Sequence, residues 1–347
     1  MTIVVWLVGG LVGGFVLERL IGKPKPASTT GSGAAPTRPK RRVGRTIGWL
    51  ALFGVIALVA TAIGGYMWAN SIFNKIETVD VSDQLATGGG TGTNYLLVGS
   101  DNGKQDGEQR EGVAGARSDT IMVLRIEGNR AMMMSLNRDL WVRNPATGAN
   151  GRLNATYNQG PANLIQAVTE NFSIPIHRYM EIDFLSFAGL VDAFGGIDIY
   201  FEHPAFDLAS GLAVEQSGLV HLNGDQALAF VRSRHYTEVI DGRHVPEGGL
   251  PDVNRTGRQQ VFLKAIMGKV ADSRNPFKLA SAADSMSSGL RIDDDMTLLQ
   301  AARFAWSMGR LNPESVVLPV VPRTTSGGAA VLDLKQPDAE ALLTKFR

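Results

Sequence analysis

Four arginines in one stretch of the chain, residues 218–260, belong to the residue type best suited to binding phosphate groups. Arg232 and Arg234 are two positions apart at the end of an apolar run, and Arg255 and Arg258 are three positions apart at the start of a predicted helix. If the apolar run ends as a strand, its two arginines point to the same side, and helical spacing gives the second pair a common face. Planar guanidinium groups suit phosphate or pyrophosphate better than lysines do. The alternative is a set of solvated surface arginines with ion-pair partners.

Three predicted strands upstream have acidic or basic residues at one end. These are Asp101 after the strand 95–98, Arg117 and Asp119 before the strand 120–126, and Arg138 after the strand 131–136. Open α/β sheets bind their ligands at the C-terminal ends of strands, so Asp101 is well placed to act on a ligand. Any one of these residues could simply form a turn. Because the pattern recurs in three successive strands, it indicates a binding or catalytic site.

The composition fits one α/β domain with a substantial core. Of the 347 residues, 44% are hydrophobic, and the formal net charge is +1. About 250 residues remain once the N-terminal region is set aside. The absence of cysteine excludes thiol catalysis, thiolate zinc sites and disulfides. Because basic residues are not in excess, we expect no nucleic-acid partner. The sequence also has no HExxH, GxSxG, Walker A or dinucleotide-binding glycine motif.

The N-terminal region divides into two apolar segments and a basic linker. Residues 1–22 are mostly apolar, and we interpret them as a short membrane span or an interfacial segment. Residues 23–46 are rich in Pro, Ser, Thr, Gly and Lys/Arg, which predicts a disordered linker. Residues 47–69 carry no charge and are long enough as a helix to cross a hydrocarbon layer of ~30 Å. The positive-inside rule places the linker in the cytoplasm and the following chain outside, on a single-pass or double-pass protein of the cell membrane.

The remaining chain predicts a stalk, residues 70–92, followed by one folded domain, residues 93–347. Hydrophobic periodicity predicts helices over 160–171, 184–194, 259–272 and 296–309, and further strands over 197–201, 315–321 and 331–334. The helix 184–194 carries an apolar stripe of Phe184, Phe187, Leu190, Val191 and Phe194. Such a stripe usually packs in a core; the alternative is that it lines a groove for a lipid.

Seven sequence blocks follow one another between residues 95 and 260. They read YLLVGSD, ARSDTIMVLRI, SLNRDLWV, GRLNATYNQGP, MEIDFLSFAGLVDAFGGIDI, GLVHLNGDQALAFVRSRH and RTGRQQ. In this order they resemble the LytR-CpsA-Psr family of Gram-positive cell-wall enzymes, and seven ordered blocks make the match far more specific than any single motif. The resemblance implies a single extracytoplasmic three-layer α/β domain with a central mixed sheet flanked by helices, preceded by one or two membrane helices.

The activity implied by this resemblance is that of a transferase in cell wall biogenesis. Such an enzyme moves a glycopolymer of arabinogalactan, teichoic acid or capsular type from a polyprenyl-pyrophosphate carrier in the bilayer to a peptidoglycan hydroxyl. A phosphodiester forms and polyprenyl phosphate is released. The resemblance implies that Asp101 and Asp119 hold a Mg²⁺ ion, with Mn²⁺ as the alternative metal.

The resemblance also implies roles for individual side chains. The catalytic set is Asp119, Arg117, Arg138, Arg232 and Arg234. The pyrophosphate is bound by Arg117, Arg138, Arg152, Arg232, Arg234, Arg255, Arg258 and Gln259, with Arg152 standing where the family commonly has lysine. The prenyl chain lies along Met132, Met134, Phe184, Phe187, Leu190 and Val191.

Two other functions fit the same residues. The first is a non-catalytic or regulatory membrane protein that binds polyprenyl phosphates, which needs the arginines and an apolar groove but neither Asp101 nor Asp119. The second is a polyprenyl-pyrophosphate hydrolase with water as the acceptor. The presence of both acidic residues favours an enzyme over a binding protein.

Overall fold

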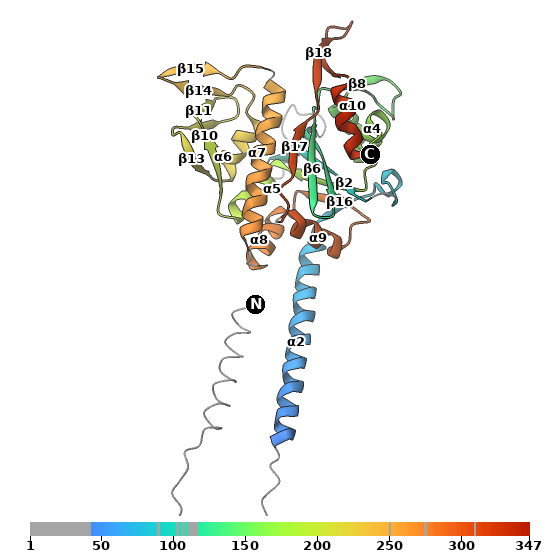
Figure 1. The fold of residues 1–347 in the computed structure, drawn as a ribbon, viewed down its shortest axis with the longest axis vertical. Coiled ribbons are helices and arrows are strands. Elements are labelled where there is room, and N and C mark those ends of the chain that lie inside the picture. The colour runs from blue at the N-terminus through green and yellow to red at the C-terminus, as the bar shows by residue number, and fades with distance from the viewer. Residues whose placement is uncertain are drawn as a thin grey trace, which may run out of the picture. The chain divides into compact units, whose positions relative to one another are not determined.

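A computed structural model describes residues 43–88, 91–101, 104–105, 108–109, 117–249, 251–273, 276–308 and 310–347. The predicted first membrane segment, residues 1–22, and most of the predicted linker lie outside these ranges. The chain divides into two compact units, Met1–Met67 and Trp68–Arg347, and the second unit contains the predicted domain (Figure 1).

A long helix, α2 (Val43–Phe73), precedes the sheet. Its portion Phe53–Phe73 has a mean hydropathy of 1.5, and none of its most apolar window is buried. By length and composition this helix can cross a membrane, which is consistent with the predicted anchor. Tyr66 and Trp68 are exposed near its C-terminal end, and these are the residue types that commonly lie at a bilayer surface.

The centre of the domain is a mixed sheet, as predicted, and it has seven strands. Its strand order is β1 (Glu77–Val79), β16 (Leu290–Asp293), β9 (Arg178–Asp183), β2 (Thr93–Asp101), β5 (Arg117–Glu127), β6 (Arg130–Leu136) and β17 (Glu314–Val317). β2 pairs in parallel with β9 and antiparallel with β5, and β17 joins the edge in parallel with β6. The strand β1 belongs to the segment predicted as a stalk, so part of that segment belongs to the folded unit.

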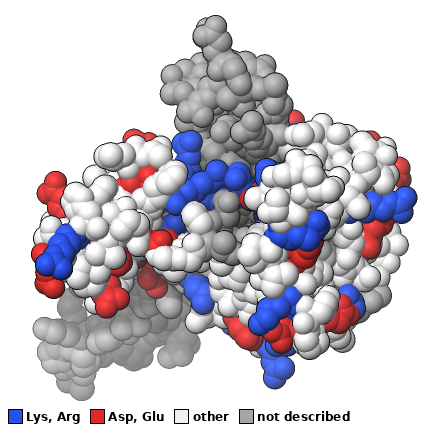
Figure 2. Space-filling view, turned by 90° about the horizontal axis from the view of Figure 1, so that it is seen from above, with Lys and Arg blue, Asp and Glu red and all other residues white. Residues whose placement is uncertain are grey.

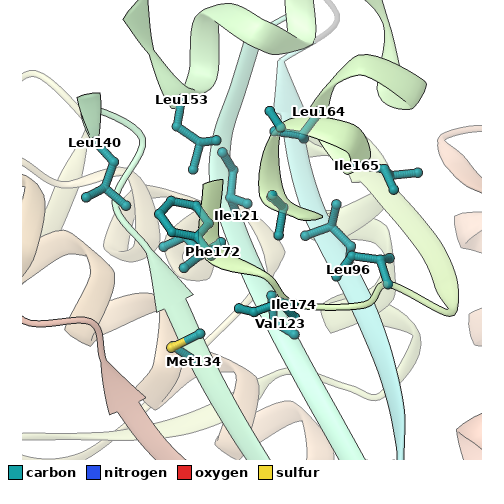
Figure 3. Close-up of a cluster of buried hydrophobic side chains, with 14 of the residues drawn as sticks. Leu96, Ile121, Val123, Met134, Leu140, Leu153, Leu164, Ile165, Phe172 and Ile174 are labelled. Atoms are coloured by element: carbon teal, nitrogen blue, oxygen red, sulfur yellow. The ribbon is translucent and has the colours of Figure 1, made fainter. Parts of the chain in front are cut away.

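Alternating apolar residues give the sheet two buried faces. Ile121 and Val123 of β5 point to one face, where they pack with Leu164 and other residues of α4 (Pro161–Phe172) (Figure 3). The short helices α3 (Leu153–Thr156) and α10 (Asp338–Leu343) lie on this side too. Met122 and Leu124 point to the other face and pack against α7 (Pro251–Asp272) and α9 (Leu298–Met308). The result is the predicted helix–sheet–helix layering.

A second lobe with its own buried cluster is inserted between β9 and α7. It contains two helices, α5 (Phe184–Ala193) and α6 (Gly224–Arg232), and α8 (Pro276–Met286) packs against it. Its strands are β10 (Ile197–Phe201) paired with β13 (Gly218–Leu222), and a four-stranded sheet of β12 (Leu212–Val214), β11 (Ala205–Asp207), β14 (Thr237–Ile240) and β15 (Arg243–Pro246). This lobe carries α6 and the loop after it, which hold two of the candidate arginines.

The apolar run before Arg232 is a helix, so its conditional assignment as a strand is wrong. Asn223 caps α6, because its side chain accepts a hydrogen bond from the Gln226 amide at 3.0 Å. The Gln226 side chain accepts one in return from the Asn223 amide at 3.1 Å, which completes a capping box. Arg232 is therefore the last helical residue, and Arg234 lies in the following loop. The two side chains do not share a strand face.

Two further element boundaries differ from those predicted. The helix predicted over 259–272, with Arg255 and Arg258 at its start, begins earlier, at Pro251. Proline is favoured in the first turn of a helix, where its missing N–H is not needed. The strand expected over 315–321 is divided into β17 and β18 (Val320–Thr324). β18 leaves the main sheet and pairs with β19 (Ala330–Leu334) as a hairpin. The remaining regular elements are β3 (Lys104–Gln105), β4 (Glu108–Gln109), β7 (Trp141–Arg143), β8 (Asn150–Arg152) and the short 3-10 turns Ser82–Gln84, Tyr157–Gln159 and Thr344–Phe346.

Candidate functional site

The ends of β2 and β5 bring three of the predicted residues next to one another along the backbone. Asp101 pairs with Arg117, Ser100 with Ser118 and Gly99 with Thr120. Asp119 is therefore the extra residue of a β-bulge, a feature common next to active sites. The side chains of Asp101, Arg117 and Asp119 lie outside the described part of the structure. Their backbone positions place them at the same end of two neighbouring strands.

The loop after β6 joins two candidate arginines through one carboxylate. Asp139 contacts the Nε atom of Arg138 at 3.5 Å and the Nε atom of Arg152 at 3.3 Å. Arg152 also donates a hydrogen bond to the carbonyl oxygen of Ala330 at 2.8 Å, which ties it to the β18–β19 hairpin. The side chains of Arg138 and Asp139 are mostly buried, whereas that of Arg152 is 43% exposed. Sequence reasoning assigned no role to Asp139, although its position directly after Arg138 at a strand end was a usable signal.

A buried carboxylate fixes the loop that follows α6. Asp207 is 1% exposed, and its Oδ2 atom accepts hydrogen bonds from the Ser233 hydroxyl at 2.7 Å and from the amides of Arg234 and His235 at 2.9 and 2.8 Å. Its Oδ1 atom accepts another from the Ala209 amide at 2.9 Å. Burial alone would raise the pKa of Asp207, but these hydrogen bonds outweigh it and lower the pKa to about 2. An ionised Asp207 thus holds the backbone between Arg232 and Arg234.

Arg258 lies on α7 and is bound by the protein itself. Its Nη1 atom pairs with Glu247 at 2.6 Å, and its Nη2 atom donates to the carbonyl oxygen of Ser233 at 2.7 Å. The guanidinium carbon lies 4.9 Å from the ring centroid of Tyr236. Burial raises the pKa of Tyr236 to about 12, even though the charge of Arg258 acts in the opposite direction. Arg258 therefore links α7 to the loop after α6 and to the β14–β15 hairpin.

Two other predicted residues lie on α7 beside Arg258. Arg255 is buried at 4% exposure, less than one helical turn before Arg258, and Gln259 is half-buried. Gln260, for which no role was predicted, is buried and donates to the Ser135 hydroxyl and to the Val316 carbonyl oxygen, both at 2.9 Å. It thereby anchors α7 to the edge of the sheet formed by β6 and β17.

A pocket of about 280 Å³ lies between the loop after β6, the start of α7 and the β18–β19 hairpin. We call it the hairpin pocket; its lining includes Asp139, Pro251, Val253, Arg323, Thr324 and Ala330. Asp139 lines this pocket and also pairs with Arg138 and Arg152. The pocket therefore borders the arginine-bearing loop, and the first turn of α7, which leads to Arg255, forms another of its walls. Figure 2 shows Lys and Arg side chains gathered near the middle of one face, between the two lobes.

The residues predicted to line a lipid groove are divided between two hydrophobic clusters. Met134 is fully buried and Met132 partly buried in the cluster under α4. Val191 is fully buried in the cluster of the second lobe, where Leu190 and Phe187 pack too, with the rings of Phe187 and Phe262 4.1 Å apart. The side chain of Phe184 is outside the described part of the structure. Met134 and Val191 are both fully buried and belong to different clusters.

The described side chains include no cluster of three or more His, Cys, Asp or Glu residues that could hold a metal ion. Because the side chains of Asp101 and Asp119 are not among them, the predicted metal pair is not tested by this observation.

Comparison with known proteins identifies similar chains in cell-wall biosynthesis. The chain is 29% identical over 343 residues to the probable cell wall biosynthesis protein LcpB of Corynebacterium glutamicum, covering 94% of this chain and 77% of that protein. It is 27% identical over 278 residues to the polyisoprenyl-teichoic acid–peptidoglycan teichoic acid transferase TagV of Bacillus subtilis, covering 72% of this chain and 65% of that protein. The solved structure of a LytR-Csp2A-Psr enzyme from Actinomyces oris superposes with a TM-score of 0.62 at 24% identity, covering 78% of this chain and 95% of that one.

The fold and the comparisons together define the class of this protein: a mixed α/β domain, preceded by an apolar helix, that is similar to proteins of cell wall biosynthesis. The chain belongs to the LytR_cpsA_psr family, whose model matches residues 62–347. The family suggested by seven sequence blocks is thus confirmed.

Proposed function

We propose that this protein is a membrane-anchored phosphotransferase that moves a glycopolymer from a polyprenyl-pyrophosphate carrier to a hydroxyl group of peptidoglycan. The observation that carries the proposal is the meeting of three arginine-bearing segments, the loop after β6, the loop after α6 and the start of α7, in a domain of this family. The named activity of the similar TagV supports it, because that protein is a polyisoprenyl-teichoic acid–peptidoglycan transferase.

In the proposed reaction, the acceptor hydroxyl oxygen bonds to the phosphorus atom that carries the glycan. The bond from that phosphorus to the bridging oxygen breaks, and polyprenyl phosphate leaves with the electron pair while the hydroxyl proton passes to solvent. Negative charge builds up on the bridging oxygen and on the phosphoryl oxygens. Arg117, Arg138, Arg232, Arg234 and Arg255 would bind those oxygens and stabilise the added charge. Arg152, which pairs with Asp139, would extend this group of arginines toward the hairpin pocket.

Asp101 and Asp119 would hold the Mg²⁺ ion. Two carboxylates at the ends of paired strands match the ligand set that Mg²⁺ takes in proteins, which is one or two carboxylates completed by substrate oxygens and water. When bound, the ion would supply positive charge to the pyrophosphate.

Arg258 would act indirectly. Its guanidinium already binds Glu247 and the Ser233 carbonyl, so it would position the loop that carries Arg234. Gln259, half-buried on the same helix, would contact the same phosphate group.

The hairpin pocket would take one sugar residue adjoining the pyrophosphate. Its volume of about 280 Å³ lies just below the usual range of small-molecule sites, roughly 300 to 1,000 Å³. Its lining combines apolar side chains such as Val253 with a few polar ones such as Thr324 and Asp139, which is the composition of sites that orient a small polar ligand.

The test is a transfer assay with the full chain, a synthetic polyprenyl-pyrophosphate glycan and a soluble peptidoglycan acceptor, with and without Mg²⁺. Metal-dependent appearance of a phosphodiester on the acceptor is the expected result. Arg232→Ala should abolish transfer. Arg130→Ala is the matched control, because Arg130 is exposed at the other end of β6 from Arg138. Release of polyprenyl phosphate without the acceptor product would indicate a hydrolase, and tight binding without turnover would indicate a binding protein.

A further inference from the structure

The helix α9 presents an unusual outer face. Its inner residues Ala301, Phe304 and Met308 pack against the domain, and Phe304 lies with its ring 4.7 Å from that of Tyr95. The outer stripe, at spacings of three and four residues, is Leu299, Ala302, Arg303 and Trp306.

This outer stripe is apolar and basic where a surface helix is normally polar. Leu299 is 60% exposed and Trp306 is 68% exposed. Arg303 is the one charged residue of the helix, and Arg310 is exposed just beyond its end. Single exposed apolar residues are common on soluble proteins and need no explanation. Here Leu and Trp share one stripe with arginine, which is the composition of helices that lie in a membrane interface.

The position of α9 supplies the second and independent observation. Phe73, the last residue of α2, packs with Ile76 and Met296 in one hydrophobic cluster, and Ala301 of α9 joins that cluster. Phe73 and α9 belong to the same compact unit. Lys75, two residues after α2, pairs with Asp284 of α8 at 2.6 Å, which ties this junction to the domain a second time. Within this unit, the residues that follow Met67 therefore enter the domain beside α9.

We propose that the outer face of α9, made of Leu299, Ala302, Arg303 and Trp306, rests on the surface of the bilayer that α2 crosses. Leu299 and Trp306 insert between lipid head groups, and Arg303 and Arg310 bind lipid phosphates. Asp294 and Asp295 lie before the first turn of the helix, at the other end from Arg310, and the exposed Glu314 lies four residues beyond Arg310. This inference rests on α2 being a membrane span and does not depend on the phosphotransferase proposal.

A second contact with the membrane has a mechanical consequence. A domain attached at the end of one helix can swing about that point. A helix that lies on the bilayer removes this freedom and sets the height of the domain above the lipid surface. For a site that acts on a lipid-linked substrate, a fixed height favours repeated productive encounters because less orientational freedom has to be lost on binding.

The absence of cysteine from the chain allows a direct test. Leu299→Cys and Trp306→Cys each introduce a single thiol for a nitroxide label in the full chain, reconstituted in vesicles of phosphatidylcholine with or without phosphatidylglycerol. Leu208→Cys and Ser326→Cys are the controls, since Leu208 is 90% exposed on the second lobe and Ser326 is exposed at the turn between β18 and β19. Unchanged circular dichroism establishes that each variant is folded.

Labels at Leu299 and Trp306 should collide with oxygen, which concentrates in lipid, several-fold more often relative to a water-soluble nickel chelate than labels at the two control positions. Adding Arg303→Gln should reduce the difference in oxygen-to-nickel accessibility of these labels between vesicles with and without phosphatidylglycerol. Equal accessibility to the nickel chelate at all four positions would overturn the proposal, because the stripe would then face water. Protection from both reagents would overturn it too, because a protein partner would then cover the stripe.

Discussion

The carboxylate of Asp207 accepts a hydrogen bond from the Ser233 hydroxyl at 2.7 Å, while the Ser233 carbonyl accepts one from Arg258 at 2.7 Å. Ser233 lies between the two candidate arginines Arg232 and Arg234. One residue of the loop is thus held by a negative group on one side and a positive group on the other. Charge-assisted hydrogen bonds of this kind are stronger than neutral ones, so the loop is fixed before any ligand binds.

Asp207→Asn should therefore weaken both the fold and the site. The new amide group would replace an acceptor that serves three donors, and we expect the free energy of unfolding to fall by about 2 kcal/mol. Transfer should slow by about 10- to 100-fold, mainly in kcat, because Arg234 is displaced. Urea unfolding and steady-state kinetics measure the two effects. Asp225→Asn is the control, since Asp225 is exposed on α6, the helix that precedes this loop. Normal kcat in Asp207→Asn would contradict the positioning role.

The same carboxylate predicts a pH dependence of stability. Its pKa in the folded protein is about 2, below the ordinary value of 3.8. The group therefore stabilises the fold above about pH 4, and this contribution, about 2 kcal/mol, is lost as the pH falls from about 4 through about 2. The difference in unfolding free energy between wild type and Asp207→Asn should shrink over that range. A difference that stays constant from about pH 4 to about pH 2 would show that folding does not lower the pKa of Asp207.

The main sheet could be predicted from the sequence because its strands carry their signal locally. Residues 120–126 are apolar at nearly every position, as expected for a strand buried on both faces, and Ile121 and Met122 do pack in separate clusters. The run before Arg232 carried no such signal. A short apolar run has no period that separates a helix from a strand. The feature that indicates a helix here is the capping pair Asn223 and Gln226, which stands before the run.

The residues that position the candidate site were harder to predict, because their partners are distant in sequence. Asp207 is 26 residues from Ser233, and no local motif relates the two. Arg258 was predicted from its residue type to bind phosphate, but its guanidinium meets Glu247, because the β14–β15 hairpin ends against α7. Residue types thus indicated which chemistry was present, and only the fold indicated which charges are already paired within the protein.

A buried network away from the candidate site predicts a purely structural effect. Glu181 is 2% exposed and accepts hydrogen bonds from the hydroxyls of Tyr157 at 2.5 Å and Tyr179 at 2.8 Å. Burial, followed by the charge of Glu181, raises the pKa of Tyr157, so this phenol stays a donor. Tyr157→Phe should lower the free energy of unfolding by about 1–3 kcal/mol, measured in urea, because a buried carboxylate loses a donor. Tyr200→Phe, at a 72% exposed position, should change it by less than about 0.5 kcal/mol. Equal losses of unfolding free energy in the two variants would contradict the role of the Tyr157 hydroxyl as a buried donor to Glu181.

The hairpin pocket gives the sharpest test of where the glycan lies. Ala330 lines the pocket and Ala329 does not, yet both are exposed and adjacent in the chain. Ala330→Trp should fill the pocket and lower transfer by about 10-fold or more, whereas Ala329→Trp should leave it near wild type. A raised KM for the peptidoglycan acceptor alone would place the acceptor sugar there, and a raised KM for the lipid-linked glycan alone would place the donor sugar there. Equal activity of the two variants, both folded by circular dichroism, would remove the pocket from the substrate path.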